Sequence, residues 1–201
     1  NLDLEGSGFT NTKSFCFDGP GPFASGNPVI ELSWPGDCPS NATWGVSIWF
    51  KVNGSSGNDQ TIICQIYDAS IGWPQYRDWS IVLQNGGDIA FEIWQTPTGG
   101  SSTLLVHPGV FDDNQWHLLC ASFNPADGPF GEIKINIDGG VPLSAPLTAA
   151  PCVAAANGGV AILSTGAQYD GGTGEYSWWP MVDGCVDECG IWGEDILADY
   201  P

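Results

Sequence analysis

The sequence predicts an all-β protein, built as an antiparallel β-sandwich of two sheets. Its apolar residues alternate with polar ones in short runs, and this period of two is typical of strands with one buried face. The 28 Gly and 15 Pro are spread along the 201 residues, as expected for many short strands joined by tight turns. At most one short C-terminal helix is expected, at residues 194–200.

The clearest strand covers residues 44–52, in which every second residue is apolar. The sequence Asn-Gly-Gly-Asp at residues 85–88 predicts a hairpin turn between strands at 79–83 and 89–94. Further strands are expected at 14–18, 29–33, 61–67, 116–123, 132–137, 160–164 and 185–192. The side chains predicted to face the core are Val46, Ile48, Phe50, Ile81, Phe91, Leu118, Ile135 and Ile162.

A single domain over residues 1–201, with its core between 14 and 200, accounts for the whole chain. The sequence shows no repeat, linker or shift in composition, and 42% apolar residues are enough for one hydrophobic core. Because the chain begins with Asn1 and not Met, we expect a processed or partial product.

The charge balance excludes nucleic acid as a partner. Four Lys and Arg stand against 23 Asp and Glu, for a net charge of −19, and the four basic residues are scattered singly. No apolar run approaches the ~20 residues that span a bilayer, so no membrane insertion is expected. Such acidity indicates solubility in a salty or calcium-containing medium outside the cytosol, or carboxylates that hold Ca²⁺.

Seven cysteines fit no zinc-binding spacing and predict disulfides if the chain matures in an oxidising compartment. Those at positions 16, 64 and 120 lie in apolar strand-like runs, where a buried free thiol is an equally good interpretation. Cys38 and Cys152, both in Pro-flanked loops, are the expected accessible pair. Cys185 and Cys189 would stand about 13 Å apart on an extended strand, too far for a bridge.

Four segments carry a family resemblance. In chain order they are WGVSIWFK at 44–51, WHLLCASF at 116–123, EIKINIDG at 132–139 and VDECGIW at 186–192. Together they resemble the laminin-G-like branch of the concanavalin A-like lectin and glucanase superfamily. The resemblance covers nearly the whole chain and implies a pentraxin-like jelly roll, a fold that hosts lectins, hydrolases and adhesion modules alike.

The carboxylates do not fit the catalytic pattern that the resemblance implies for a glucanase. That pattern needs two carboxylates at alternate positions of one strand, so that both reach one cleft. Asp187 and Glu188 are neighbours instead, predicted on opposite faces of an extended strand, and Asp183 would stand about 13 Å from Asp187. His117, beside Trp116, is predicted to be a packed structural residue. We therefore predict that the protein is not an enzyme.

Aromatic residues in predicted loops are the expected ligand-binding residues, because a pyranose ring stacks on an aromatic plane. The loop at 166–180 concentrates four of them, flanked by glycines, and is the predicted principal contact surface; a second cluster precedes residue 77. These candidates are Tyr169, Tyr176, Trp178, Trp179, Trp73 and Tyr76. The alternative is that these rings pack at the sandwich edge or against another subunit.

Calcium is a further expectation, since laminin-G-like and pentraxin-like relatives often carry Ca²⁺ at a loop rim. Hard cations take oxygen ligands, and the nearest carboxylates supply them. The candidate metal ligands are Asp170, Glu175, Asp183 and Asp18.

Two functions remain open at this point. The first is a non-catalytic extracellular or surface-displayed module for glycan binding or adhesion. The second is a structural assembly protein, such as a virion decoration or fibre subunit, whose loops contact neighbouring subunits in a homo-oligomer or larger assembly. Both place the chain outside the cell or on a virion or cell surface.

Overall fold

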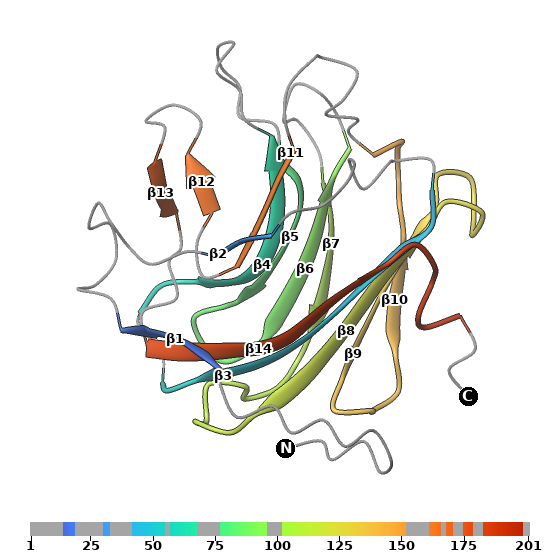
Figure 1. Ribbon diagram of the computed structural model, residues 1–201. Coiled ribbons are helices and arrows are strands. Elements are labelled where there is room, and N and C mark those ends of the chain that lie inside the picture. Colours follow the sequence, from blue (N-terminus) through green and yellow to red (C-terminus); the bar gives the residue numbers. More distant parts are fainter. Residues whose placement is uncertain are drawn as a thin grey trace, which may run out of the picture.

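The computed structural model describes residues 14–18, 30–32, 42–54, 57–67, 77–95, 102–151, 161–165, 168–170, 175–178 and 183–198. Within these ranges every regular element is a strand and every strand pair is antiparallel. Two six-stranded sheets pack face to face, and a separate two-stranded hairpin lies at one side (Figure 1). No helix long and apolar enough to cross a membrane is found in the described ranges.

Sheet A has the strand order β1-β14-β3-β8-β9-β10. Its strands are β1 (Phe15–Asp18), β14 (Asp183–Trp192), β3 (Trp44–Val52), β8 (His117–Asn124), β9 (Glu132–Ile137) and β10 (Leu143–Pro146). The first and last strands of the sequence are therefore neighbours, and β14 and β3 run side by side across the sheet (Figure 1).

Sheet B has the order β2-β11-β4-β5-β6-β7. Its strands are β2 (Ile30–Leu32), β11 (Ala161–Thr165), β4 (Gln60–Tyr67), β5 (Arg77–Leu83), β6 (Ile89–Trp94) and β7 (Ser102–His107). The predicted hairpin joins β5 to β6, with Gln84 and Asp88 closing the turn by a backbone hydrogen bond of 2.8 Å. The two-stranded hairpin consists of β12 (Gln168–Asp170) and β13 (Glu175–Trp178).

The core lies between the inner faces of the two sheets, as the alternation in the sequence predicts. Six of the predicted core side chains are at most 1% exposed, namely Val46, Ile48, Phe50, Ile81, Phe91 and Ile135. Trp44 of sheet A stacks on Trp79 of sheet B with ring centroids 4.8 Å apart, which ties the layers together. The side chain of Ile162 lies outside the described residues.

One core prediction is wrong. Leu118 pairs with Trp49 and faces outward, whereas Leu119 pairs with Ile48 and is fully buried. The two leucines are adjacent in sequence, so period two alone could not decide which of them faces the core.

Four strands were not predicted: β7, β10, β12 and β13. The first two are short edge strands, and β10 contains Pro146, a residue that sheets tolerate at their edges. The other two form a hairpin inside the segment that was predicted to be a loop. At the C-terminus, residues 196–198 form a turn and not a helix.

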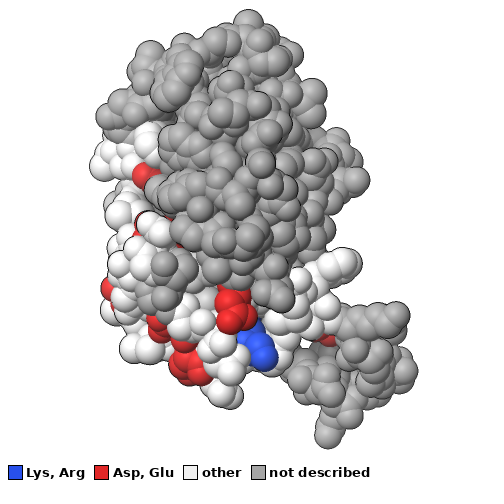
Figure 2. Space-filling model, turned by 90° about the vertical axis from the view of Figure 1, so that its left-hand side faces the viewer, with Lys and Arg blue, Asp and Glu red and all other residues white. Residues whose placement is uncertain are grey.

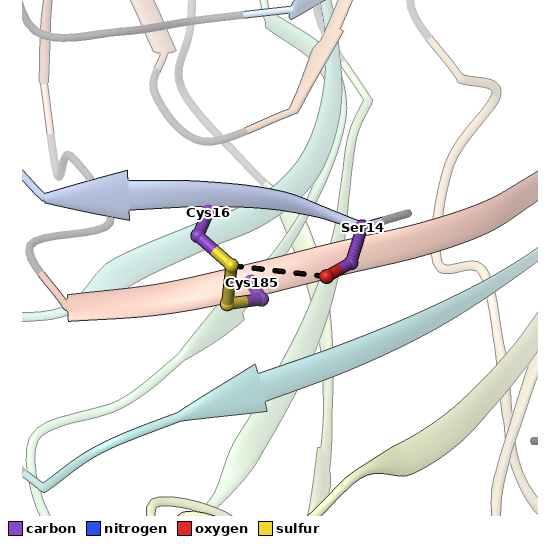
Figure 3. Close-up of a disulfide and its surroundings, with 3 residues drawn as sticks. All are labelled: Ser14, Cys16 and Cys185. Atoms are coloured by element: carbon purple, nitrogen blue, oxygen red, sulfur yellow. Dashed lines mark hydrogen bonds between the residues drawn. A yellow bond between two sulfur atoms is a disulfide. The ribbon is translucent and has the colours of Figure 1, made fainter. Parts of the chain in front are cut away.

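A disulfide joins the two ends of the fold. Cys16 of β1 and Cys185 of β14 are cross-strand partners with Cα atoms 4.0 Å apart (Figure 3). Of the other described cysteines, Cys64 is buried, and Cys120 and Cys189 are free thiols. A bridge between Cys185 and Cys189 is thus absent, as predicted, while the predicted partners Cys38 and Cys152 lie outside the described residues.

Candidate functional site

A β-bulge in β14 changes which side chains of this strand face outward. Asp187 pairs with Trp49 and Gly190 pairs with Ser47, so three steps along β14 match two steps along β3. One extra residue in a strand reverses the alternation of side chains beyond it. Even-numbered residues of β14 therefore face the core before the bulge, and odd-numbered residues face it after the bulge.

Burial on either side of the bulge follows this reversal. Before it, Val186 is 4% exposed and belongs to the core; after it, Ile191 packs against the core and Trp192 is 45% exposed. Glu188 lies within the bulge with φ of 45°, in the left-handed region that non-glycine residues rarely occupy. Bulges re-aim side chains in this way, and here the exposed Glu188 joins the outer surface of sheet A.

The indole of Trp192 lies against the outer face of the sheet. Its Nε1 donates a hydrogen bond of 3.3 Å to Ser47 Oγ on the neighbouring strand. A Cβ built on Gly190 would stand 3.1 Å from Nε1 and Cζ2 of the indole, so this edge of the ring occupies the space that a side chain at residue 190 would fill. The edge is held against Gly190 and Ser47, while Trp192 as a whole stays 45% exposed.

The segment after β14 is fixed across the same face by a buried carboxylate. Asp195 Oδ1 accepts a hydrogen bond of 2.5 Å from Ser122 Oγ, and Oδ2 accepts one of 2.9 Å from Lys134 Nζ. Burial would raise the pKa of Asp195, but these donors outweigh burial and lower it. Lys134 also donates to Asp127 at 3.2 Å, so this basic side chain is fully engaged by two carboxylates.

Between Trp192 and this segment lies a groove of about 470 Å³, which we call the outer groove. It is lined by Ser47, Trp49, Leu118, Cys120, Glu188, Trp192, Glu194 and Ile196. Its lining combines two indoles and aliphatic side chains with two exposed glutamates, and among the described residues it includes no Lys, Arg or His. Exposed aromatic surface with a few acceptors beside it suits a ring-shaped ligand with polar substituents.

His117 is structural, as predicted. It occupies the end of the inner face of β8, where Nδ1 contacts Asp138 Oδ2 at 2.7 Å and Nε2 contacts Asp113 Oδ1 at 3.0 Å. Its ring also packs against Phe50 and Phe111, with centroids 5.5 and 5.2 Å away. Burial would lower the pKa of His117, but the two carboxylates outweigh it and raise the pKa.

The side chains of the predicted ligand-binding residues lie outside the described residues. Tyr169, Tyr176 and Trp178 belong to the β12–β13 hairpin, where the backbones of the two tyrosines are paired, but their side chains lie outside the described residues. Trp73, Tyr76 and Trp179 lie outside them entirely. Within the segment at 166–180, residues 168–170 and 175–178 form paired strands, in contrast to the loop that was predicted.

The four predicted metal ligands fall into two cross-strand pairs. The register places Asp18 opposite Asp183, and Asp170 opposite Glu175. Of these four, Asp183 alone has a described side chain; it is exposed, and its Oδ2 accepts a hydrogen bond of 2.9 Å from Asn53 Nδ2. In the described part of the chain, no group of three or more His, Cys, Asp or Glu side chains could hold a metal ion.

Sequence reasoning missed the outer groove because the bulge carries no clear signal in the sequence. In a regular strand, Trp192 would share the inner face with Val186, and Glu188 would do the same. The prediction that Asp187 and Glu188 lie on opposite faces of an extended strand is therefore corrected: the strand is bulged there, and Glu188 lines the groove. Gly190, next to Cys189 in the strand, was the only hint of irregularity.

Comparison with known proteins bears on the fold. A family profile described as the concanavalin A-like lectin/glucanases superfamily, of laminin G type, matches residues 25–199. A search of curated proteins finds no match.

Solved structures give the same architecture. The CBM40 module of the Ruminococcus gnavus IT-sialidase, bound to alpha2,3 sialyllactose, covers 80% of each chain with a TM-score of 0.60 and 12% identity. Domains LG4-5 of the mouse laminin alpha1 chain cover 89% of this chain and 42% of that one, with a TM-score of 0.55 and 16% identity. The receptor binding domain of botulinum neurotoxin type G covers 93% and 44%, with a TM-score of 0.53 and 12% identity. At such identities the likeness shows the fold alone.

Proposed function

The chain belongs to the concanavalin A-like lectin/glucanases superfamily, and on that premise we propose that it is a non-catalytic glycan-binding module. The observation that carries the proposal is the outer groove, where the half-exposed indole of Trp192, its Nε1 edge held against Gly190 and Ser47, lies beside two glutamates. A pyranose has one apolar face that stacks on an indole, and hydroxyl groups that donate to carboxylates. The CBM40 module bound to sialyllactose shows that a sandwich of this type can hold a sugar.

The exposure of the two groove glutamates supports a binding role over a catalytic one. Glycosidases raise the pKa of one carboxyl by burial or by a close like charge, so that it can donate a proton near neutral pH. Glu188 and Glu194 are both exposed to solvent. Asp187, the other carboxylate of the bulge, instead accepts the backbone N–H of Glu188 at 2.8 Å and is absent from the groove lining.

The test is the Trp192→Ala variant on a glycan array, followed by titration of the best ligand. Loss of an aromatic anchor costs ~2 kcal/mol or more, which is about 30-fold in Kd. Trp116→Ala is the matched control, because Trp116 is 37% exposed but lies outside the groove. Equal binding by both variants would show that the groove is not the glycan site.

Subunit contact is the competing function for the same indole, and the same variant separates the two. If Trp192→Ala binds glycans like the parent but changes the sedimentation coefficient, the groove serves assembly and our proposal is wrong. The exposed apolar side chains Phe15 and Val141, 67% and 79% exposed, make this a real alternative.

The remaining expectations are part of the proposal. We place the module outside the cell or on a virion or cell surface, with a glycan or a protein as partner, and the Cys16–Cys185 disulfide is compatible with that location. The aromatic hairpin at 168–178 is a second proposed contact surface. Calcium is proposed at the carboxylate pair formed by Asp18 and Asp183, and repeating the glycan array with EDTA tests whether binding requires it.

A further inference from the structure

Resting on the proposed function, we infer that the outer groove selects sugars that carry a free amine, such as glucosamine oligosaccharides, over neutral and acidic sugars. Two carboxylates line the groove, and the described lysines lie elsewhere on the sheet.

The charged groups of the groove have one sign. Glu188 and Glu194 both line it, and none of the described lining residues is basic. On the face shown in Figure 2, red Asp and Glu groups recur over the described surface, while blue is confined to one area. With a net charge of −19, the whole molecule strengthens this negative potential.

The two described lysines of sheet A do not supply a positive charge to the groove. Lys134 is bound by Asp127 and Asp195, at 3.2 and 2.9 Å, and its side chain is 16% exposed. Lys51 lies over the ring of Trp116, with Nζ 5.9 Å from the ring centroid, and neither residue is part of the groove lining. A bound sialic or uronic acid would therefore face two carboxylates, and the described residues offer it no cationic partner, which is unfavourable.

An ammonium group fits the same surroundings well. It can donate charge-assisted hydrogen bonds to a carboxylate, and a cation over the face of an indole is attracted by the ring quadrupole. The bulge serves both contacts, because it brings Glu188 and Trp192 to the same face of the sheet. The platform that stacks the sugar ring and the carboxylate that holds its amine thus come from one irregularity in β14.

The experiment compares three sugars by isothermal titration calorimetry at low and high salt. A glucosamine trimer and an N-acetylglucosamine trimer differ only at their nitrogens, which are charged amines in the first and neutral acetamides in the second, and sialyllactose supplies the opposite charge. We expect the glucosamine trimer to bind about fivefold or more tightly than its acetylated counterpart, with the difference shrinking at high salt. A trilysine peptide of equal charge controls for attraction to the acidic surface, and it should bind more weakly than the glucosamine trimer.

A pair of variants with matched charge locates the effect. Glu188→Gln should weaken glucosamine binding about fivefold more than it weakens N-acetylglucosamine binding, because a glutamine oxygen can still accept from a hydroxyl group but carries no charge to pair with an ammonium. Glu92→Gln removes the same charge from β6 of sheet B, where a glutamine oxygen can still accept the hydrogen bond of 2.6 Å from Ser102 Oγ, and should leave both affinities unchanged.

The outcomes separate this inference from the function on which it rests. Equal binding of the two trimers, tighter binding of sialyllactose, or equal losses in the two glutamate variants would overturn the amine preference while leaving glycan binding intact. Binding of trilysine as tight as that of the glucosamine trimer would overturn it too. If no sugar binds, or if Trp192→Ala binds every sugar like the parent, the proposed function itself fails.

Discussion

The two faces of sheet A follow different rules, although the same strands build both. On the inner face of β3, every second residue is buried to within 3% exposure, and the pattern is readable from the sequence without error. On the outer face, the position of Trp192 depends on one extra residue in β14, which the alternation of apolar residues does not predict. The regular face provides stability, and the irregular face carries the groove.

This difference indicates where functional residues are to be expected in such a sandwich. A core face is constrained by packing, so that its residues are interchangeable mainly by size. A bulge interrupts the regular ladder of hydrogen bonds, and here it places Glu188 in a strained backbone conformation. Strained conformations of this kind persist where the surrounding structure holds them in place. The contrast can be tested by disturbing each face in turn.

Truncation of the inner face should give the largest effect. Phe50→Ala removes a fully buried ring from the core and should lower the free energy of unfolding by about 3–5 kcal/mol. Trp192→Ala on the outer face should lower it by only about 1 kcal/mol, because that side chain is half exposed. Urea unfolding followed by circular dichroism measures both. Comparable losses would mean that Trp192 is a core residue and that the two faces do not differ as described.

Removal of the disulfide should give the next largest effect. The bridge closes a loop with a sequence separation of 169 residues, and the double variant Cys16→Ser/Cys185→Ser should lose about 2–4 kcal/mol of unfolding free energy. The matched control is Cys189→Ser, which alters a free thiol in the same strand and should have little effect. If the double variant is as stable as the parent, the Cys16–Cys185 bridge contributes little to the stability of the fold.

The sequence predicted the regular part of this molecule well and the irregular part poorly. Strand β3 and its inward residues could be predicted, because a shift by one residue would turn all of its alternating apolar side chains toward water. Leu118 was misplaced because both it and Leu119 are apolar. Cys16 and Cys185 were not predicted as partners, because their contact depends on a tertiary pairing of the first and last strands.

The candidate site could be predicted only as a class of residues. The sequence favoured exposed aromatics from predicted loops, whereas the described groove takes Trp49 and Trp192 from strands. Both residues were predicted to lie in strands. The face that Trp192 occupies could not be predicted, because the direction of side chains beyond a bulge depends on the number of inserted residues. Whether the aromatic hairpin at 168–178 also binds ligands stays a prediction.

A smaller change in the unfolding free energy is expected from the protonation of His117, which lies at the end of the inner face. The pKa of His117 is raised in the folded state by Asp138 and Asp113, so protonation stabilises the fold. This contribution is fully present below the unfolded pKa of about 6.5 and is lost as the pH rises through the higher folded pKa. The unfolding free energy should therefore fall as the pH is raised above about 6.5, by less than in either variant above. The His117→Gln variant should lack this component; an identical profile in both proteins would assign the dependence to other groups.

The smallest expected effect comes from a substitution in the bulge itself. Here the substitution to glycine should raise stability relative to the substitution to alanine. Glycine adopts a positive φ without penalty, whereas an L-residue in the left-handed region costs ~1 kcal/mol. Glu188, with φ of 45°, carries this cost. Glu188→Gly should therefore be more stable than Glu188→Ala by about 1 kcal/mol, although both variants lose the same carboxylate and should weaken glucosamine binding equally. Thermal unfolding and titration of the two variants side by side provide the measurement. If the alanine variant is the more stable of the two, residue 188 does not adopt the left-handed conformation in solution. The extra residue of β14 would then be accommodated elsewhere, and the placement of Trp192 on the outer face would lose its structural explanation.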